Sequence, residues 1–242
     1  MAAYFISDLH LTAARGAAIQ QLVDFTARVP DSGDTLYVLG DLFDYWAGDD
    51  DGLDTAPGQR AAAAFAAAAA RGVGLYFLPG NRDFLIGAAF CEAARLTLLA
   101  DNAAFDVHGA RTVLLHGDTL CTDDRAYQQF RTTVRSRDWC DAFLARPAPE
   151  RRSEIEALRA KSETEKAAKP EAIMDVNAAA VRNLFRESNA ARMIHGHTHR
   201  PAAHDYLMFG HTCVRWVLPA WDQRAGYLRV DERGDLLIYL EP

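Results

Sequence analysis

The sequence is poor in cysteine and lacks any long apolar run. Its four cysteines, Cys91, Cys121, Cys140 and Cys213, form no Cys-x-x-Cys pair, which argues against a zinc–thiolate site and a dithiol redox motif. We expect each to be a small core residue. No apolar segment approaches the roughly 20 residues of a membrane-spanning helix. The opening MAAYFISDLH lacks a basic region and predicts a strand, so we expect no signal peptide and a protein that stays in the cytosol.

Lysine is scarce and confined to one segment. Residues 125–169 contain all three lysines (Lys161, Lys166 and Lys169) and carry 11 Lys/Arg against 7 Asp/Glu. The rest of the chain carries 15 Lys/Arg against 26 Asp/Glu. An acidic body with one basic segment is not the pattern of a general nucleic-acid binder, so we expect no nucleic-acid partner. The pattern indicates a protein that receives an anion at one place.

The apolar pattern predicts a layered α/β fold. Half of the 242 residues are hydrophobic, which is ample for a full core. Continuous apolar runs end in polar residues, as in YFISDLH, TLYVLGD, GLYFLPGN, RTVLLHGD and RMIHGHTH. Such runs predict strands covered on both faces. Helical stretches between them, such as GQRAAAAFAAAAARG, complete a strand–helix alternation. After Pro201, the shorter runs CVRWVLPAW, AGYLRV and DLLIYL predict antiparallel completion of a second sheet.

Residues from about 123 to 169 interrupt this alternation. DRAYQQFRTTVRSRDWCDAFLA predicts a helix with an apolar stripe at Tyr127, Phe130, Val134 and Trp139. RPAP ends that helix because proline cannot continue it, and ERRSEIEALRAKSETEKAAK predicts a second, highly charged helix. We expect one domain over residues 1–242, with a helical hairpin inserted at about 123–169. A solvated surface excursion is the alternative for the insert.

Polar residues gather at the predicted strand ends. They are Asp8, His10, Asp41, Asp44, Asn81, Arg82, Asp83, His116, His195, His197 and His199. Ligands of open α/β sheets bind beyond the carboxyl ends of strands, so we expect these side chains to form one site. Imidazole, carboxylate and amide donors without thiolate suit manganese, iron, zinc or similar divalent ions. Seven donors exceed what one ion would take while keeping an open position, so two ions that share a carboxylate fit better.

The order of these motifs resembles that of the calcineurin-like metallophosphoesterases. The resemblance rests on Asp8-x-His10, Gly40-Asp41-x-x-Asp44, Gly80-Asn81-Arg82-Asp83, His116 and Gly196-His197-x-His199, which span most of the chain. The strings GDLFDYWAGDD, GNRDFL, HGDTLCTDD, AIMDVN and HGHTHRPA resemble the branch of that family that hydrolyses UDP-2,3-diacylglucosamine in lipid A biosynthesis. The resemblance implies an α/β/β/α sandwich with the helical hairpin as a lid. It also implies a metal-dependent diphosphatase with two divalent ions, and manganese is the expected metal.

The resemblance also implies a role for individual residues. One ion would be held by Asp8, His10 and His199, and the other by Asn81, His116 and His197, with Asp41 bridging. The catalytic residues would be Asp41, Asn81, Arg82 and His197. Substrate would contact Asn81, Arg82, Asp124, Ser162, Lys166, Lys169 and His197. Asp124 also suits the cap of the following helix, and the lysines also suit a solvated helix face.

The remaining polar residues receive supporting roles. We expect His195 to lie behind the ligands or to face substrate, and Asp44 and Asp118 to orient histidines. His108, His204 and His211 lie outside every motif, and we expect them to be surface or ordinary structural residues.

Arg82 stands where many members of the broader family have histidine. A histidine can protonate an alcohol leaving group. A phosphate monoester, with a second pKa near 6, leaves as an anion and needs charge neutralisation instead. Arginine stays charged and offers a fork that matches phosphate oxygens. Arg82 therefore predicts a diphosphate substrate, with an ion pair to Asp83 as the alternative.

The implied reaction is attack of metal-activated water on the uridine-side phosphorus, which yields UMP and 2,3-diacylglucosamine 1-phosphate. We expect an acyl-chain slot lined by the hairpin residues Phe130, Val134, Trp139 and Phe143, with ordinary helix packing as the alternative. Tyr45 and Trp46 would wall the site. Such a lipid requires peripheral association with the cytoplasmic side of the inner membrane, and the basic hairpin is the expected contact. We expect no obligate protein partner.

Two other functions compete with this interpretation. Another metallophosphoesterase would act on soluble nucleotide diphosphates or phosphodiesters, and the hairpin and Arg82 argue against it. A non-catalytic scaffold would be expected to lose metal ligands, whereas all seven are present here.

Overall fold

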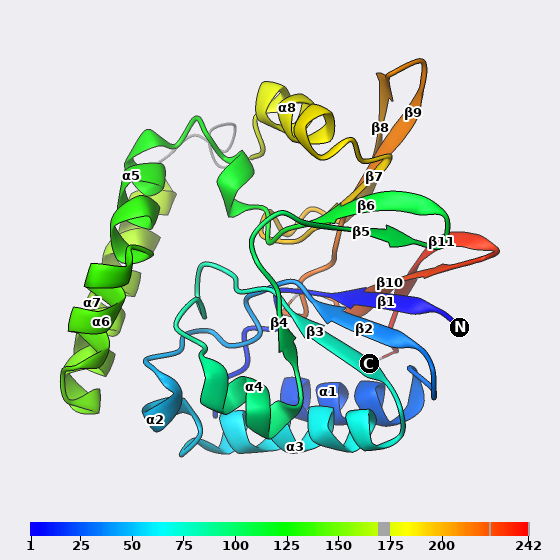
Figure 1. The fold of residues 1–242 in the computed structure, drawn as a ribbon. Helices are drawn as coiled ribbons and strands as arrows, with labels where there is room; N and C mark the ends of the chain where they lie inside the picture. The colour runs from blue at the N-terminus through cyan, green and yellow to red at the C-terminus, as the bar shows by residue number, and fades with distance from the viewer. Residues whose placement is uncertain (169–174, 223, 242) are drawn as a thin grey trace.

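The computed structural model describes residues 1–168, 175–222 and 224–241, with the backbone alone for residues 161 and 163–168. Two sheets lie face to face, and helices cover the outer face of each (Figure 1). Within these residues, one sheet has the strand order β11-β10-β1-β2-β3-β4 and the other has the order β5-β6-β7-β9-β8. The expected α/β/β/α sandwich is confirmed.

The elements follow one another along the chain in a regular strand–helix order at first. The strands are β1 (Ala3–Ile6), β2 (Thr35–Val38), β3 (Gly74–Phe77), β4 (Thr97–Leu98), β5 (Ala103–Val107), β6 (Ala110–Leu114), β7 (Arg192–His195), β8 (Ala202–Met208), β9 (His211–Val217), β10 (Gly226–Asp231) and β11 (Gly234–Tyr239). The helices are α1 (Gly16–Arg28), α2 (Asp49–Gly52), α3 (Ala56–Ala70), α4 (Ala88–Ala94), the 3-10 turn η1 (Asp118–Leu120), α5 (Arg125–Val134), α6 (Arg137–Leu144), α7 (Ala148–Ala168) and α8 (Ala178–Ser188).

The first sheet is covered on its outer face by α1, α3 and α4 (Figure 1). The alanine-rich helix α3 begins after Thr55, whose side chain accepts a hydrogen bond from the Gly58 N–H group. It ends at Gly72, which adopts a φ of +96°. Its small side chains allow close packing on α1 and the sheet, and Phe65 is fully buried there. The predicted helix at GQRAAAAFAAAAARG is confirmed, and it begins two residues earlier, at Ala56.

A second apolar layer fills the space between the sheets. It contains Phe5, Leu39, Leu114, Ile194 and Leu228, each with no exposed surface. On the far side of the second sheet, α8 packs through its apolar face against β6, β7 and β9. Both faces of the central strands are therefore buried, which explains their continuous apolar composition.

The last strands differ from the prediction. We expected all the strands after Pro201 to complete a second sheet, but only β8 and β9 do so. Strand β9 pairs in parallel with β7, and β8 then pairs antiparallel with β9. Strands β10 and β11 return to the first sheet, where Val230 pairs antiparallel with Ala3. Strand composition gives no information on which of two open sheet edges a strand will join.

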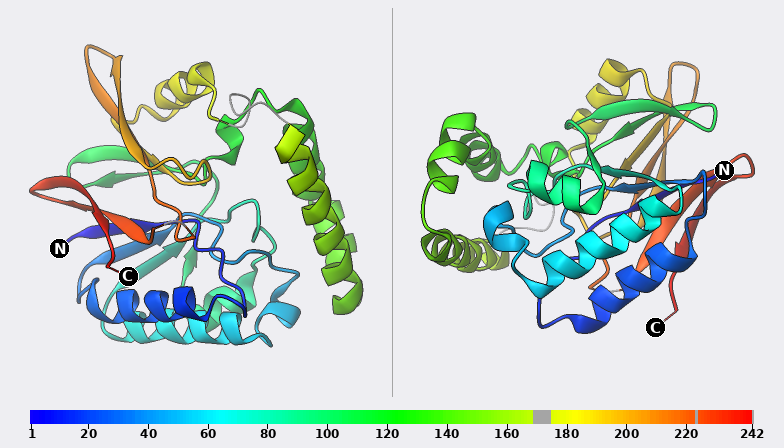
Figure 2. Two further views of the ribbon diagram at one scale, coloured as in Figure 1. Left: turned by 180° about the vertical axis from the view of Figure 1, so that it is seen from behind. Right: turned by 60° about the horizontal axis from the view of Figure 1, so that its bottom comes forward.

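The insert contains three helices rather than the predicted two. Helices α5 and α6 are separated at Arg135 and Ser136, because the Ser136 hydroxyl accepts a hydrogen bond from the Trp139 N–H group and begins a new helix. Helix α7 then runs back beside them, and all three lie to one side of the sandwich (Figures 1 and 2). No helix of the described residues has the length and apolar composition required to span a bilayer.

Arginines of α7 connect the insert to the loops that follow β2. Arg159 forms an ion pair with Asp44 at 2.6 Å, and Arg152 pairs with Asp51. Arg151 is 1% exposed and donates to both carboxylate oxygens of Asp50. A buried, bidentate arginine is a stronger connection than an exposed ion pair. The insert is thereby held next to the carboxyl ends of the strands of the first sheet.

Candidate metal centre and substrate cavity

The predicted ligands come together where the turns after β1, β2, β3, β6 and β7 meet. Five of them adopt a left-handed backbone conformation, with φ values of 55° for Asp8, 46° for His10, 51° for Asp41, 68° for His197 and 53° for His199. Such conformations cost free energy in residues other than glycine and are concentrated at functional sites. The polar turns are therefore conformationally specialised and are not ordinary surface loops.

Glycine in the motifs permits these turns to touch. A Cβ atom at Gly80 would lie 2.2 Å from Oδ1 of Asp41, and one at Gly196 would lie 2.0 Å from Oδ2 of Asp8. Any side chain at either position would push a carboxylate away from the centre. The Gly-Asn and Gly-His pairs of the sequence are explained by this close approach.

The first group of donor atoms consists of Asp8, His10 and His199. Nε2 of His199 lies 3.3 Å from Oδ1 of Asp8 and 3.2 Å from Nε2 of His10. Oδ1 of Asp8 and Nδ1 of His10 are buried and have no hydrogen-bond partner among the described residues. Buried polar atoms without a partner are costly, and a divalent cation would satisfy such atoms. The predicted first ligand set fits an ion.

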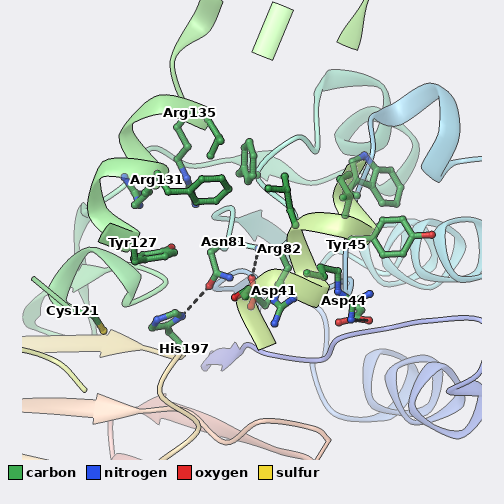
Figure 3. A pocket seen from close by; sticks show the side chains of 18 of the residues that line it. Asp41, Asp44, Tyr45, Asn81, Arg82, Cys121, Tyr127, Arg131, Arg135 and His197 are labelled. Atoms are coloured by element: carbon green, nitrogen blue, oxygen red, sulfur yellow. Dashed lines mark hydrogen bonds and ion pairs between the residues drawn. The ribbon is translucent and has the colours of Figure 1, made fainter. Parts of the chain in front are cut away.

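The second group is formed around Asn81. Its Oδ1 atom lies 3.0 Å from Nε2 of His116 and 2.9 Å from Nδ1 of His197 (Figure 3). Nδ1 of His116 donates to the carbonyl of Leu39 at 2.9 Å, which leaves Nε2 available as a ligand atom. This arrangement is the usual one for a metal-binding histidine.

Asp41 connects the two groups. Its Oδ1 atom lies 3.5 Å from Nε2 of His116, and its Oδ2 atom lies 3.9 Å from Nδ1 of His10. The carboxylate is 2% exposed, and burial raises its pKa. Burial alone would lower the pKa of His116, but the neighbouring Asp41, Asp8 and Asp118 carboxylates raise it to about 9. The centre thus concentrates negative charge that a cation would neutralise.

Asp83 holds two of these turns together. Its carboxylate accepts hydrogen bonds from the N–H groups of Leu42 at 2.7 Å, Gly80 at 2.8 Å and Asp41 at 3.2 Å. Burial, followed by the nearby Asp41 charge, raises the pKa of Asp83 to about 6. Asp83 therefore uses its oxygens to fix the backbone, a different role from the ion pair with Arg82 considered above.

His195 does not face the substrate. It is completely buried, and its Nε2 atom lies 2.9 Å from NH1 of Arg215. Burial, together with the Arg215 guanidinium, lowers the pKa of His195 to about 3, so the ring is neutral. Of the two positions expected for this residue, the one behind the ligands is correct. His108, His204 and His211 are exposed, as expected.

Within the described residues, neither Asp44 nor Asp118 has a hydrogen bond to a histidine, although the charge of Asp118 raises the pKa of His116. Asp44 pairs with Arg159 of the insert. Asp118 is buried, and it accepts hydrogen bonds from the Tyr127 hydroxyl at 2.8 Å and from Nε of Arg131 at 2.7 Å. The Tyr127 ring in turn lies 6.3 Å from the His197 ring, centre to centre. Both carboxylates thus position the insert relative to the centre. The sequence could not predict this because these pairs depend on where the insert packs.

Asp118→Ala is expected to lower the free energy of unfolding by about 3 kcal/mol, because the change leaves the partly buried Arg131 and the Tyr127 hydroxyl without their acceptor. Urea unfolding of the metal-free protein measures this change. Asp101→Ala is the matched control, because Asp101 pairs with the same arginine at 2.7 Å but is 40% exposed. The control is expected to cost about 0.5 kcal/mol. Equal losses in the two variants would contradict the anchoring role of Asp118.

A cavity of about 570 Å³ lies between the donor groups and the insert (Figure 3). Its polar lining includes His10, Asp41, Asn81, Arg82, Asp124, Ser162, His197 and His199. Its apolar lining includes Tyr45, Trp46, Phe84, Leu85, Phe130, Val134, Trp139, Ile155 and Leu158. Tyr45 and Trp46 therefore wall the site, as expected. Phe143 does not belong to this lining; it is a core residue, 2% exposed and stacked on Trp139.

Five of the seven predicted substrate contacts lie on the cavity wall, and the other two fall outside the described side chains. Asp124 lines the cavity and also caps α5 by accepting a hydrogen bond from the Tyr127 N–H group. Ser162 lines the cavity from α7. The side chain of Lys166 and the whole of Lys169 lie outside the described residues.

The sequence interpretation missed four arginines of the cavity wall. Arg131 lines it from α5, Arg135 from the position just after α5, Arg159 from α7 and Arg200 from the loop after β7. Arg135 also donates to the Gly80 carbonyl at 2.7 Å. The signal that could have identified two of them is the spacing of four that puts Tyr127, Arg131 and Arg135 on one helix face. Cys121 also lines the cavity, and burial raises the pKa of its thiol to about 12.

Comparisons with known proteins agree with this geometry. Residues 1–201 match the family model described as calcineurin-like phosphoesterase. A protein named UDP-2,3-diacylglucosamine hydrolase from Aromatoleum aromaticum is 50% identical over 97% of this chain and 95% of its own length. Proteins of the same name from Nitrosococcus oceani and Aeromonas hydrophila subsp. hydrophila are 43% and 45% identical, over 97% and 94% of this chain and 93% and 94% of their own lengths. With its two donor groups, its α/β/β/α sandwich and these relatives, the chain belongs to the calcineurin-like phosphoesterase family.

Proposed function

We propose that this chain hydrolyses the pyrophosphate bond of UDP-2,3-diacylglucosamine to UMP and 2,3-diacylglucosamine 1-phosphate, a step of lipid A biosynthesis. The observation that carries the proposal is a single cavity that joins the metal-donor groups to an apolar wall supplied by the insert. The names of the relatives support the same substrate. A soluble nucleotide diphosphate or phosphodiester has no acyl chains, so it would make no contact with the apolar wall.

Seven residues would hold two divalent ions, for which the family resemblance suggests manganese. Asp8, His10 and His199 would hold one ion, Asn81, His116 and His197 would hold the other, and Asp41 would contribute to both sets. The unpartnered atoms of Asp8 and His10 support this assignment. Bound ions of this kind supply positive charge to phosphate oxygens and lower the pKa of a bound water.

The protein's own groups would bind and orient the diphosphate. Arg82 lines the cavity next to Asp41 and Asn81 (Figure 3), and its guanidinium would neutralise phosphate oxygens there. Asp124 and Ser162 would contact the substrate from the insert, and Lys166 and Lys169 remain proposed contacts on the family resemblance. Attack at the uridine-side phosphorus leaves the sugar 1-phosphate as an anion. In heavy-oxygen water, the label is therefore expected in UMP alone.

The test is hydrolysis of UDP-2,3-diacylglucosamine by the purified protein with manganese and with EDTA. Release of UMP and the lipid 1-phosphate is expected with the metal and is expected to be lost with EDTA. The matched substrate is UDP-glucosamine without acyl chains, which should be cleaved at least about tenfold less efficiently, since it lacks the apolar contacts. Cleavage of soluble phosphodiesters without cleavage of the lipid would support the alternative function.

We further propose that residues 1–242 form one catalytic domain and that the insert brings it to the cytoplasmic side of the inner membrane. The basic balance of residues 125–169 supports this, because clustered cations are attracted to anionic lipid headgroups. Arg125 and Arg137 are exposed cations of the described part of the insert.

Binding to anionic vesicles is expected to fall at least about tenfold between about 50 mM and about 500 mM salt, because exposed charges are screened. Arg137→Glu is expected to weaken vesicle binding about fivefold or more, since each cation near the surface contributes about 1 kcal/mol. Arg233→Glu is the control, since Arg233 is exposed on the β10–β11 turn, away from the insert (Figure 1). Cosedimentation measures both changes. Binding that is insensitive to salt would contradict electrostatic docking.

A further inference from the structure

The loop after β7 contains a strained turn at a proposed metal ligand. The Thr198 N–H group donates to the carbonyl of Gly196 at 2.8 Å, and His197 between them has a φ of 68°. A hydrogen bond across one residue of positive φ defines the rarer, strained form of the γ-turn. Such a conformation persists only when the surrounding structure holds it. The turn matters because it directs His197 toward Asn81.

A second hydrogen bond reaches the same carbonyl. Nδ1 of His195 lies 2.8 Å from the Gly196 oxygen, and Nε2 of His195 lies 2.9 Å from NH1 of Arg215 on β9. A guanidinium can only donate, so Nε2 must accept. The ring proton is then on Nδ1, where it donates to the Gly196 carbonyl. His195 is 0% exposed and Arg215 is 5% exposed, so bulk water is a poor substitute for either partner.

We propose that Arg215 is a positioning residue for the metal centre: by donating to His195, it selects the tautomer that supports the γ-turn at His197. Arg215 belongs to none of the motifs of the family and lies on a strand at some distance along the chain from the ligand loop. The proposal rests on the metal-binding part of the proposed function and is independent of the substrate.

The loss of Arg215 has a specific consequence. His195 is then free to carry its proton on Nε2, which turns a lone pair of Nδ1 toward the Gly196 oxygen. The γ-turn loses one of its two hydrogen bonds and gains a repulsion, so His197 moves away from Asn81. Residues that orient metal ligands typically change metal affinity by about 10- to 100-fold when they are removed. The site that uses His197 should lose more affinity than the site that uses His199, because His197 is the central residue of the γ-turn, and Asp8 and His10 of the other site lie on another turn.

The experiment titrates metal-free protein with Mn²⁺ and follows the free ion by electron paramagnetic resonance. Arg215→Met should weaken one of the two sites by about 10- to 100-fold. Arg215→Lys retains a donor and should therefore avoid most of that loss of Mn²⁺ affinity. Tyr206→Phe is the matched control, because it removes the Tyr206 hydroxyl from Nε of Arg215, at 3.2 Å, and leaves the contact with His195. The control should bind Mn²⁺ as the wild type does.

A second protein variant, His195→Asn, distinguishes a positioning role of Arg215 from a general contribution to stability. In His195→Asn, the amide nitrogen lies near the former Nδ1 and can donate to Gly196 without help from Arg215. Adding Arg215→Met to this variant should change Mn²⁺ affinity by less than about threefold. Thermal unfolding of each metal-free variant records stability separately.

Three outcomes test the role of Arg215 and distinguish it from the proposed function. Unchanged affinity in Arg215→Met, or equal losses in the wild-type and His195→Asn backgrounds, would overturn the proposal. Wild-type protein that binds Mn²⁺ but does not cleave the lipid would overturn the proposed function and leave this inference in place.

Discussion

Asp41→Asn is expected to lower the turnover of UDP-2,3-diacylglucosamine by at least about 10³-fold, because it removes the charge that the two donor groups share. Asp41 approaches His116 of one group and His10 of the other. The substitution preserves the shape of the side chain. The amide oxygen can still accept a hydrogen bond from the backbone N–H group of Arg82, which lies 2.8 Å from Oδ1 of Asp41. The loss is therefore expected in folded protein.

The measurement combines steady-state kinetics with the metal content of the purified variant. We expect Asp41→Asn to retain cooperative unfolding but to bind less than the wild-type amount of manganese. Asp106→Asn is the control, since Asp106 is an exposed carboxylate of β5 far along the chain from every ligand. It should leave turnover and metal content unchanged. Turnover of Asp41→Asn above about a tenth of the wild-type value would exclude a bridging role.

Arg82→His is expected to reduce cleavage of the diphosphate by about 10²- to 10³-fold, the range seen when one charge-stabilising group is removed from a transition state. Two adjacent phosphates concentrate negative charge, and a neutral imidazole neutralises less of it than a guanidinium does. A phosphodiester with an alkyl leaving group requires a proton donor instead of a fixed positive charge. Its alkoxide needs a proton, which histidine can supply and arginine cannot.

The informative quantity is the ratio of kcat/KM for the diphosphate to kcat/KM for an alkyl phosphodiester. We expect Arg82→His to lower this ratio by more than about tenfold, and Arg82→Lys to lower it much less because the charge remains. Arg95→His, at an exposed residue after α4, serves as the control. A parallel loss on both substrates would mean that Arg82 supports the site without selecting the diphosphate.

Much of the centre was predictable because it depends on strand ends. Asp8, Asp41 and Asn81 each follow an apolar run of strand length. Neighbouring parallel strands place their carboxyl ends at one edge of a sheet, so any polar residues there must meet. The structure brings these three residues together with His116 and His197 from the second sheet. The order of strands and polar residues along the chain was sufficient to predict this part of the site.

Helix limits were predictable where one residue decides them. Thr55 and Gly72 bound the alanine-rich helix α3 in the structure, and both act through local properties, a side-chain cap and a positive φ. Ser136 is a cap of the same kind that we overlooked, since the apolar stripe continues across it. The prediction of one continuous helix for the first half of the insert was therefore wrong.

The partners of buried polar groups could not be predicted in this way. Asp118 was expected to face a histidine, yet it binds Tyr127 and Arg131 of the insert. Asp44 likewise binds Arg159 of α7. Each carboxylate is near several possible donors along the chain, and only the packing of the insert against the sandwich selects among them.

The sequence by itself predicted the layered α/β fold and the polar residues gathered at its strand ends, since strand periodicity and motif residues are local features of the chain. The tertiary structure alone decided that β10 joins the first sheet, that Phe143 belongs to the core, and that Arg215 supports His195. These outcomes depend on contacts between residues far apart in sequence. Such contacts are selected by the total burial and hydrogen bonding of the folded chain, which no single segment encodes.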